Sequence, residues 1–334
     1  MKTYSFSLFL MFMAGISILS GCKQQIPKVG ILLHSYENER WTKDKNYLVD
    51  NLKKLGAEVM FEVADNNQQK QIAQAQDMIS KGVKVLIVVA INQDQAGQIV
   101  EMAHKDNVKV IAYDRLINNC ALDYYVTANS TSIGGLMTSY CTSLKPKGKY
   151  AIIPGSKYDN NAMKLFIGQM NVLQPYMEKG DIQVVYSEFT EAWTPAEGSL
   201  HTNAILDQNG DSITAIICGS DAITNGVLVT LKERGLAGKI MVTGQDAELG
   251  NVQAILHGTQ TCDILKPLKE MAQTTAELAV TLATGKPLTM KFTTESNGKV
   301  LVKSILIDAT LVNRNNIETT VVASGFHTSA QINQ

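Results

Sequence analysis

Short apolar runs alternate with amphipathic segments along the chain from Lys28 onward. The run Val83–Val89 is almost uninterrupted and rich in β-branched residues, which is typical of a strand covered on both faces. Between such runs, apolar side chains recur at helical spacing, as in Gln68–Lys81, and Gly82 follows at the position that favours a helix end. Strands that alternate with helices in this way predict an α/β protein with parallel, doubly wound sheets.

This alternating pattern divides into two successive series. The first is predicted to hold strands at 29–33, 59–63, 83–89 and from 108 onward, with helices at 41–55, 68–81 and 95–106. The second is predicted to hold strands at 124–128, 150–153, 182–186, 213–218, 240–243 and 261–265, with helices at 131–144, 161–177, 195–209, 222–234 and 247–257. A further long helix is predicted to follow Lys266-Pro267. Two series favour two lobes over a single sheet, and a cleft between lobes is a usual place for a small ligand.

Polar and charged side chains follow the ends of several predicted strands. Asp114-Arg115 come directly after the strand that begins at Val108. The comparable stretches elsewhere are Glu39-Arg40-Trp41, Asp159-Asn160-Asn161, Gly219-Ser220-Asp221, Gly244-Gln245-Asp246 and Lys266-Pro267. In open α/β sheets ligands bind beyond the carboxyl ends of the strands, so these stretches are predicted to line a binding cleft.

Helix capping is the alternative explanation for part of this set. Asp221 and Asp246 precede predicted helices and suit N-cap positions, and Pro267 suits a first helical turn. Capping does not call for Arg40 or Arg115, however. We therefore expect a binding role for the set as a whole.

Both tryptophans lie among charged and hydroxylated residues rather than in apolar strands. An indole beside acids, amides and arginines suits a pyranose, whose C–H faces pack on aromatic rings while its hydroxyls need donors and acceptors. Trp41 and Trp193 are therefore candidate sugar-binding residues. The alternative is that each indole merely covers the start of a helix.

Composition and charge argue against several functional classes. The 334 residues include 30 basic and 31 acidic side chains, giving a formal net charge of -1, which argues against a nucleic-acid or anionic-membrane surface. No Gly-x-Gly-x-x-Gly motif follows the first strand and no Walker loop is present, so no nucleotide cofactor is expected. Cys120, Cys141, Cys218 and Cys262 form no Cys-x-x-Cys pair, and no metal site is expected. A disulfide between Cys120 and Cys141 is conceivable.

The first 22 residues form a different kind of segment. Lys2 precedes an apolar run, Phe6–Leu19, that is too short for a stable membrane span and is typical of a secretory signal. The small residues before Cys22 resemble the lipobox of bacterial lipoproteins, in which that cysteine carries the lipid. The sequence therefore predicts a periplasmic or otherwise extracytoplasmic protein anchored through Cys22. An ordinary signal followed by an incidental cysteine is the alternative.

Taken in order, many stretches resemble one known family. They include Glu39-Arg40-Trp41, Ala112-Tyr113-Asp114-Arg115-Leu116-Ile117-Asn118, Asp159-Asn160-Asn161-Ala162, Gly168-Gln169-Met170, Gly235-Leu236-Ala237-Gly238-Lys239, Gly244-Gln245-Asp246-Ala247, Gly258-Thr259-Gln260-Thr261, Lys266-Pro267 and Gly325-Phe326-His327. Together they span nearly the whole chain after the signal segment. They are similar to the type I periplasmic binding proteins of ABC sugar importers, and most similar to the xylose-binding members of that family.

This resemblance implies two Rossmann-like lobes joined by a multi-strand hinge, with a sugar held between them. The implied first lobe comprises residues 27–129 and about 263–292, and the implied second lobe comprises 130–262 and about 293–330. The residues that match sugar-contacting positions are Arg40, Trp41, Asp114, Arg115, Asp159, Asn161, Trp193, Ser220, Asp246 and Lys266. The resemblance further implies a non-enzymatic monomer that closes on D-xylose or a related aldose and delivers it to the membrane permease of an ABC importer.

Two departures from the xylose-binding pattern leave the exact sugar open. Ser220 stands where that pattern has an asparagine, and His34-Ser35 replace a pair of aspartates at the end of the first strand. A sugar sensor that signals to a membrane histidine kinase or chemoreceptor is an alternative with the same binding chemistry. A hydrolase using Asp114 and Asp159 is another, but the neighbouring basic side chains keep carboxylates ionised and suit binding better than acid catalysis.

Overall fold

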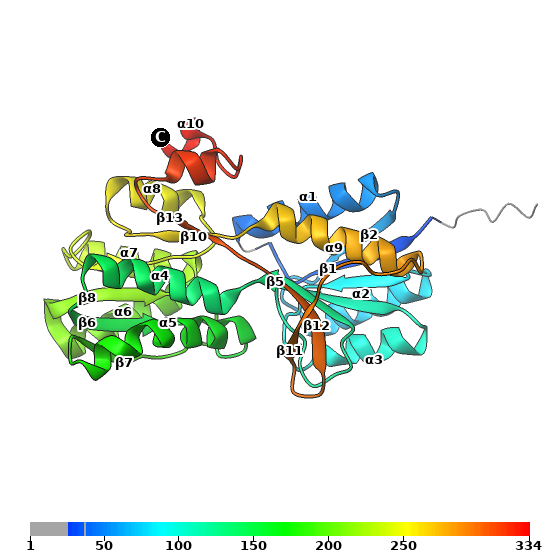
Figure 1. Cartoon of the computed structure of the whole chain (residues 1–334), viewed down its shortest axis with the longest axis horizontal. Coiled ribbons are helices and arrows are strands. Elements are labelled where there is room, and N and C mark those ends of the chain that lie inside the picture. The colour runs from blue at the N-terminus through cyan, green and yellow to red at the C-terminus, as the bar shows by residue number, and fades with distance from the viewer. Residues whose placement is uncertain (1–25, 37) are drawn as a thin grey trace, which may run out of the picture.

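The first lobe is built on one sheet with the strand order β11-β12-β5-β4-β3-β1-β2, shown on the right of Figure 1. The computed structural model describes residues 26–36 and 38–334. The strands of this sheet are β1 (Lys28–Leu33), β2 (Glu58–Val63), β3 (Val85–Val88), β4 (Lys109–Tyr113), β5 (Tyr124–Ala128), β11 (Thr293–Ser296) and β12 (Leu301–Ile307). Neighbouring strands are parallel, except that β11 runs antiparallel to β12.

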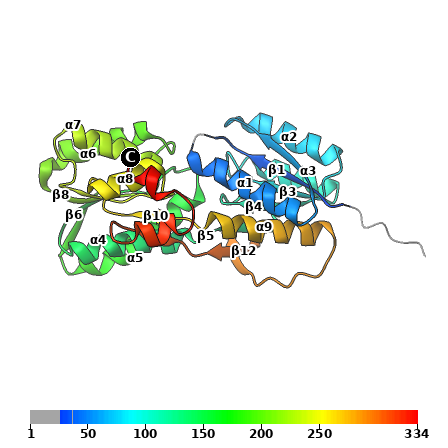
Figure 2. The ribbon, with the colours of Figure 1, turned by 90° about the horizontal axis from the view of Figure 1, so that it is seen from above.

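Helices cover both faces of this first sheet. Helices α1 (Glu39–Lys54) and α9 (Leu268–Ala283) pack together on one face, and α2 (Gln68–Ser80) and α3 (Gly97–Lys105) lie on the other (Figure 2). Every residue of β3 is buried as a result. This explains why the sequence of that strand is apolar throughout rather than alternating.

The second lobe repeats the arrangement on a smaller sheet, with the strand order β7-β6-β8-β9. Its parallel strands are β6 (Gly148–Ile153), β7 (Ile182–Ser187), β8 (Ile213–Cys218) and β9 (Met241–Val242). A separate antiparallel pair, β10 (Asp263–Leu265) and β13 (Thr310–Val312), lies beside them.

The helices of the second lobe also form two layers. One face of the sheet carries α4 (Ser130–Leu144) and α5 (Asn160–Glu178), and the other carries α6 (Pro195–Asn209) and α7 (Asp221–Glu233) (Figure 2). Helix α8 (Leu249–His257) contacts the short C-terminal helix α10 (Ser329–Ile332). A 3₁₀ turn at Gly210–Ser212 and a π-helical turn at Glu318–Val322 complete the elements of the described residues.

Within the described residues the chain passes between the lobes at 128–130, 265–268 and 307–310. This path corrects the predicted lobe boundaries. Residues 293–307, assigned to the second lobe from the sequence, form β11 and β12 instead, and β12 completes the first sheet along the edge of β5. Asp263–Leu265, assigned to the first lobe, pairs as β10 with β13 of the second lobe.

The predicted fold class, two α/β lobes with parallel sheets, is confirmed. The predicted strand and helix positions up to residue 265 agree with the structure to within a few residues, whereas β11, β12 and β13 were not predicted. Among the described residues, no helix combines the length and apolarity needed to cross a lipid bilayer. The predicted signal segment and Cys22 lie outside the described residues.

The conceivable disulfide between Cys120 and Cys141 is not formed. Both are buried free thiols, as are Cys218 and Cys262. Cys120 packs in the core beneath α2 and α3 of the first lobe, whereas Cys141 lies on α4 of the second. A bridge between them is therefore excluded by their positions in different lobes.

Candidate functional site

The carboxyl ends of strands from both lobes border one cavity. It is lined by Asn38, Arg40, Trp41, Asp114, Arg115, Asp159, Asn161, Trp193, Ser220, Gln245, Asp246 and Lys266. All ten candidate residues of the sequence analysis are in this set. The first lobe supplies residues from the start of α1 and the end of β4, and the second supplies residues that follow β6, β8 and β9. We call this cavity the inner cavity.

Arg40 lies at the centre of the inner cavity and bridges the lobes. Its guanidinium donates to Asp44 Oδ2 at 3.1 Å and Asp114 Oδ1 at 3.0 Å on the first lobe, and to Asp246 Oδ1 at 3.2 Å on the second. The Lys266 ammonium lies 3.6 Å from Asp114 Oδ1 and 3.4 Å from Asp246 Oδ1. Two buried cations and their carboxylates therefore form one ionic group across the cleft.

Burial and charge act in opposite directions on these carboxyl groups. Burial alone raises the pKa of Asp114, but Arg40, Lys266 and Arg115 outweigh it and hold that pKa below its ordinary value. Asp44 accepts a hydrogen bond from the Tyr113 hydroxyl, and burial raises its pKa against the effect of Arg40. Asp114 is thus a carboxylate that accepts hydrogen bonds at any physiological pH.

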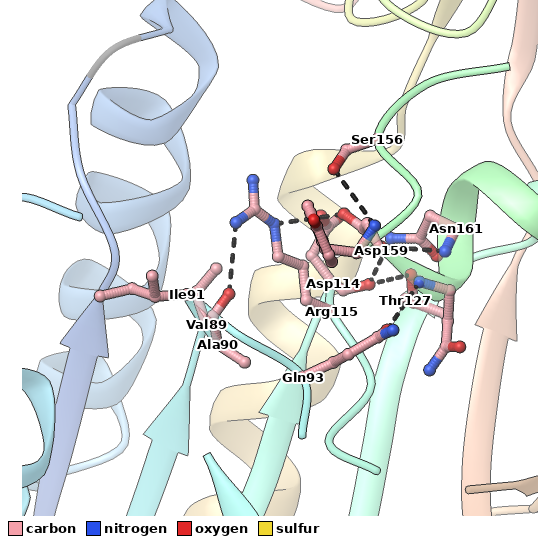
Figure 3. A network of polar contacts seen from close by, with 12 residues as sticks. Val89, Ala90, Ile91, Gln93, Asp114, Arg115, Thr127, Ser156, Asp159 and Asn161 are labelled. Atoms are coloured by element: carbon pink, nitrogen blue, oxygen red, sulfur yellow. Dashed lines mark hydrogen bonds and ion pairs between the residues drawn. The ribbon is translucent and has the colours of Figure 1, made fainter. Parts of the chain in front are cut away.

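The main chain at Asp114 is held in place from both lobes. Its φ is 63°, and its carbonyl accepts from the Thr127 hydroxyl at 3.0 Å and from Asn161 Nδ2 at 2.8 Å (Figure 3). Asn161 Oδ1 accepts from Ser130 Oγ at 3.0 Å. The Asn161 amide is therefore engaged at both ends with protein groups, and it fixes Asp114 as well as lining the cavity.

Arg115 and Asp159 face each other from opposite lobes. Arg115 Nε lies 3.4 Å from Asp159 Oδ2, and Arg115 Nη1 donates to the Ala90 carbonyl at 3.2 Å (Figure 3). Asp159 Oδ1 also caps α5 by accepting from the Asn161 backbone N–H at 2.9 Å. Burial raises the pKa of Asp159 and Arg115 opposes that rise.

The two indoles approach the inner cavity from different lobes. Trp41 is buried on α1, with the Arg40 guanidinium 4.2 Å from the centre of its ring and the His34 imidazole edge-on at 4.4 Å. Trp193 comes from the loop before α6 and packs directly over the main chain of Gly155. One indole from each lobe therefore borders the inner cavity.

Replacing Gly155 by alanine is expected to weaken ligand binding about tenfold, because an added Cβ would lie 2.0 Å from the Trp193 ring and displace it. Gly155 also has a φ of 126°, so part of the effect is backbone strain. Gly180→Ala is the matched control, since Gly180 has a φ of 73° with open space around it. Calorimetric titration that found equal weakening in both variants would contradict this role for Trp193.

The capping explanation for the candidate aspartates is wrong in detail. Helix α7 begins at Asp221 and is capped by Ser220, whose Oγ accepts from the Ile223 N–H at 3.4 Å. Glu248 precedes α8, while Asp246 has a φ of 110° and turns toward Arg40 instead. Pro267 occupies the position before α9 rather than its first turn. The Ser220 hydroxyl therefore has a structural role beside its place in the cavity wall.

Two residues of the inner cavity, Asn38 and Gln245, were not among the ten candidates. Gln245 donates from Nε2 to the Gly219 carbonyl at 3.1 Å, and its buried Oε1 has no partner among the described residues. Gln245 precedes the candidate Asp246 in a stretch predicted to line the cleft, so its position in the sequence could have identified it. In the part of the chain that the structure describes, no group of histidine, cysteine and acidic side chains could hold a metal ion.

Comparison with known proteins agrees with this geometry. Residues 29–287 match the periplasmic binding protein domain family, and the chain belongs to that family. It is 35% identical to the D-xylose-binding periplasmic protein of Escherichia coli (strain K12), over 91% of this chain and 92% of the relative. It is 31% identical to the multiple sugar-binding periplasmic receptor ChvE of Rhizobium radiobacter, over 91% and 92% respectively.

Solved structures of the same family superpose closely. A solute-binding protein of an ABC transporter from Clostridium phytofermentans, with bound β-D-glucose, has a TM-score of 0.82 and 28% identity, covering 91% of this chain and 99% of that one. A carbohydrate transporter solute-binding protein from Chloroflexus aurantiacus, in complex with D-glucose, has a TM-score of 0.83 and 25% identity, covering 91% and 97%.

Proposed function

We propose that this protein binds a monosaccharide, D-xylose or a related aldose, in the cleft between the lobes, where it contacts the residues of the inner cavity. The observation that carries the proposal is the placement of Trp41 and Trp193, one from each lobe, beside the ionic group centred on Arg40. A sugar ring offers C–H faces to the indoles, and its hydroxyls need the donors and acceptors that the ionic group supplies. The sugar-binding relatives support the same conclusion.

Closure of the lobes follows from the same contacts. A ligand that touches both lobes stabilises the closed arrangement more than the open one, so binding shifts the population toward closure. The three segments that join the lobes within the described residues are suited to serve as a hinge. We further propose that the closed form, anchored through a lipid on Cys22, delivers the sugar to the permease of an ABC importer.

The relatives favour this role over the enzymatic alternative, because they are named as binding proteins and receptors. The electrostatics agree: Asp114, Asp246 and Asp159 all face basic side chains, which suits hydrogen-bond acceptance. A pentose has about ten heavy atoms, and the upper limit of binding free energy is ~1.5 kcal/mol per heavy atom. A micromolar Kd needs only ~8 kcal/mol in total, so a ligand of this size can reach it.

Titration of the purified protein with a panel of aldoses tests the proposal. We expect one or two monosaccharides to raise the melting temperature by mass action, with D-xylose first among the candidates. Asp246→Ala is expected to abolish that rise, because Arg40 and Lys266 then lose their partner on the second lobe. The control Asp207→Ala, on the exposed face of α6, should leave the rise unchanged. Absence of a rise with every aldose would refute the proposal.

A further inference from the structure

The last stretch of the chain, residues 313–334, is fixed to the second lobe, and we call it the C-terminal segment. It continues from β13, which pairs with β10 of that lobe. Its helix α10 packs on α8, where Gln253 Nε2 donates to the Gln331 carbonyl at 2.9 Å (Figure 1). A contact between this segment and the first lobe is therefore a contact between the lobes.

Two lysines of the first lobe hold the C-terminal segment. Lys43 on α1 donates from Nζ to the Phe326 carbonyl at 2.9 Å, and the same ammonium lies 3.8 Å from the centre of the Phe326 ring. Lys269 on α9 donates from Nζ to the Ser324 carbonyl. Gly325, between these two carbonyls, has a φ of 70°. Neighbouring helices of the first lobe thus engage two carbonyls of one tight turn.

The residue that follows this turn contacts the sugar-binding cleft from behind. His327 is 3% exposed, and its Nε2 lies 2.8 Å from the Ala247 carbonyl. Because a carbonyl can only accept, Nε2 carries the proton and donates. Ala247 follows Asp246, the residue that pairs with Arg40 across the cleft. The C-terminal segment therefore contacts both the first lobe and the main chain that positions a candidate sugar ligand.

A cavity of about 230 Å³ lies between the C-terminal segment and the segments that join the lobes. Its lining includes Tyr47, Pro267 and Thr310 as well as Ser324 and Phe326. Along this cavity the C-terminal segment stands away from α9 and from the joining segments. The lobes can therefore part here by breaking the two lysine contacts, without unpacking a continuous core.

We propose that the C-terminal segment is a latch that holds the lobes closed over the bound sugar. Lys43 and Lys269 engage it as the lobes close, and His327 passes that contact on to the turn that carries Asp246. Lys43 and His327 are positioning residues, since neither lines the inner cavity. The role in sugar binding rests on the proposed function, whereas the latch itself stabilises the closed form whether or not a sugar is bound.

Stopped-flow measurement of sugar release from the full chain tests this inference, with D-xylose and D-glucose as probes. Lys43→Met keeps an alkyl chain beside the Phe326 ring but removes the donor. It is expected to speed release about tenfold and to leave the association rate unchanged, because the latch engages after the sugar has entered the open cleft. Lys43→Arg, which restores a charged donor, should recover most of the slow release.

The matched control is Lys45→Met on the same helix. The Lys45 ammonium also lies near a phenyl ring, 5.6 Å from the centre of Phe61, but both residues belong to the first lobe. Release should therefore be unchanged in this variant. Equal acceleration in Lys43→Met and Lys45→Met, or none in either, overturns the latch.

His327→Leu tests the connection to the Asp246 turn. We expect faster release in this variant, and recovery in His327→Gln, whose amide can donate in place of Nε2. A role confined to stability predicts the opposite pattern, in which the melting temperature of the free protein falls while the release rate of the bound sugar stays the same. That pattern overturns the connection between His327 and Asp246.

A measurement without sugar separates the latch from the proposed function. Small-angle X-ray scattering of the free protein is expected to give a larger radius of gyration when Lys43→Met and Lys269→Met are combined, and no change for Lys45→Met. If neither probe binds, the release experiment gives way to this one. An unchanged radius then overturns the latch, whereas a larger radius supports it even though the proposed function has failed for these sugars.

Discussion

Arg40→Ala is expected to abolish sugar binding and to lower the free energy of unfolding by about 3 to 5 kcal/mol. The substitution removes a partner of Asp44, Asp114 and Asp246 at once. Lys266 remains beside Asp246, and Lys266 and Arg115 remain near Asp114. Uncompensated carboxylates buried this deeply are costly, because they lose both water and counter-charge. Denaturant unfolding and calorimetric titration of the variant measure the two effects.

The control for this prediction is Arg234→Ala. Arg234 also pairs with an aspartate, Asp207 at 3.0 Å, but both side chains are exposed to solvent. Its removal should cost less than about 1 kcal/mol and leave binding unchanged. If Arg40→Ala were as mild as this control, the ionic group would not be what fixes the cleft.

Raising the pH from about 5 to about 8 is expected to lower the stability of the second lobe by about 3 kcal/mol and to weaken sugar binding. The cause is a pair of buried carboxyl groups behind Asp246. Asp221 Oδ1 accepts no hydrogen bond from an N–H or hydroxyl group of the described residues, and it lies with Asp263 Oδ2 beneath Gly244, where an added Cβ would be 2.2 Å and 2.7 Å from them. Two carboxyl oxygens this close are stable when they share one proton.

The direction of the pH effect follows from the raised pKa values of this pair. Burial raises the pKa of Asp263 to about 6, and burial together with Asp263 holds the pKa of Asp221 well above its ordinary value. The shared proton is bound in the folded protein and absent from the unfolded chain, so its contribution is present at low pH and is lost as the pH rises through about 6 and above. Glu248, whose pKa burial and Asp246 raise to about 7, titrates in the same direction.

Two isosteric variants isolate the pair from Glu248. Asp221→Asn keeps an oxygen to accept from the Glu248 N–H and gains an amide that donates to Asp263, so most of the loss at high pH should disappear. Asp263 accepts hydrogen bonds from the backbone N–H groups of Ala247 and Ile264 and from Gln260 Nε2. Asp263→Asn places an amide donor among these donors and should destabilise the protein by about 1 to 3 kcal/mol. Thermal melts across this pH range that showed equal behaviour for both variants would refute the shared proton.

The Asp221–Asp263 pair matters for binding because it holds the turn that presents Asp246. Asp221 accepts from Glu248 at one end of this turn, and Asp263 accepts from Ala247 within it. Asp246 and Ala247 have φ values of 110° and 52°, which are strained for residues with side chains. The hydrogen bonds to the acid pair therefore offset that strain and direct the Asp246 carboxylate toward Arg40.

The sequence was sufficient to predict much of the fold and of the cleft. Apolar runs such as Val85–Val88 are covered on both faces, and a short uninterrupted run rich in β-branched residues favours a buried strand. The strand ends were equally informative, because parallel strands bring Asp114 and Asp246 to the edges that face the cleft. The prediction rested mainly on the order of helices and strands along the chain, which local sequence patterns indicate well.

Features that depend on contacts distant in sequence were not predictable in this way. Strand β12 alternates buried and exposed residues, yet nothing local shows that it pairs with β5 rather than with the second sheet. The same holds for Asp221, which the sequence suggested as a helix cap. Its true partner is Asp263, 42 positions further along and brought near only by the folded second lobe.

The place of β12 at the edge of β5 has a consequence for biogenesis. A nascent chain that has emerged only as far as α9 exposes the unpaired edge of β5, because the strand that covers it ends at Ile307. Open edges of this kind are templates for association with other chains. The first lobe therefore reaches its finished form only after β12 has been synthesised, about 170 residues after β5.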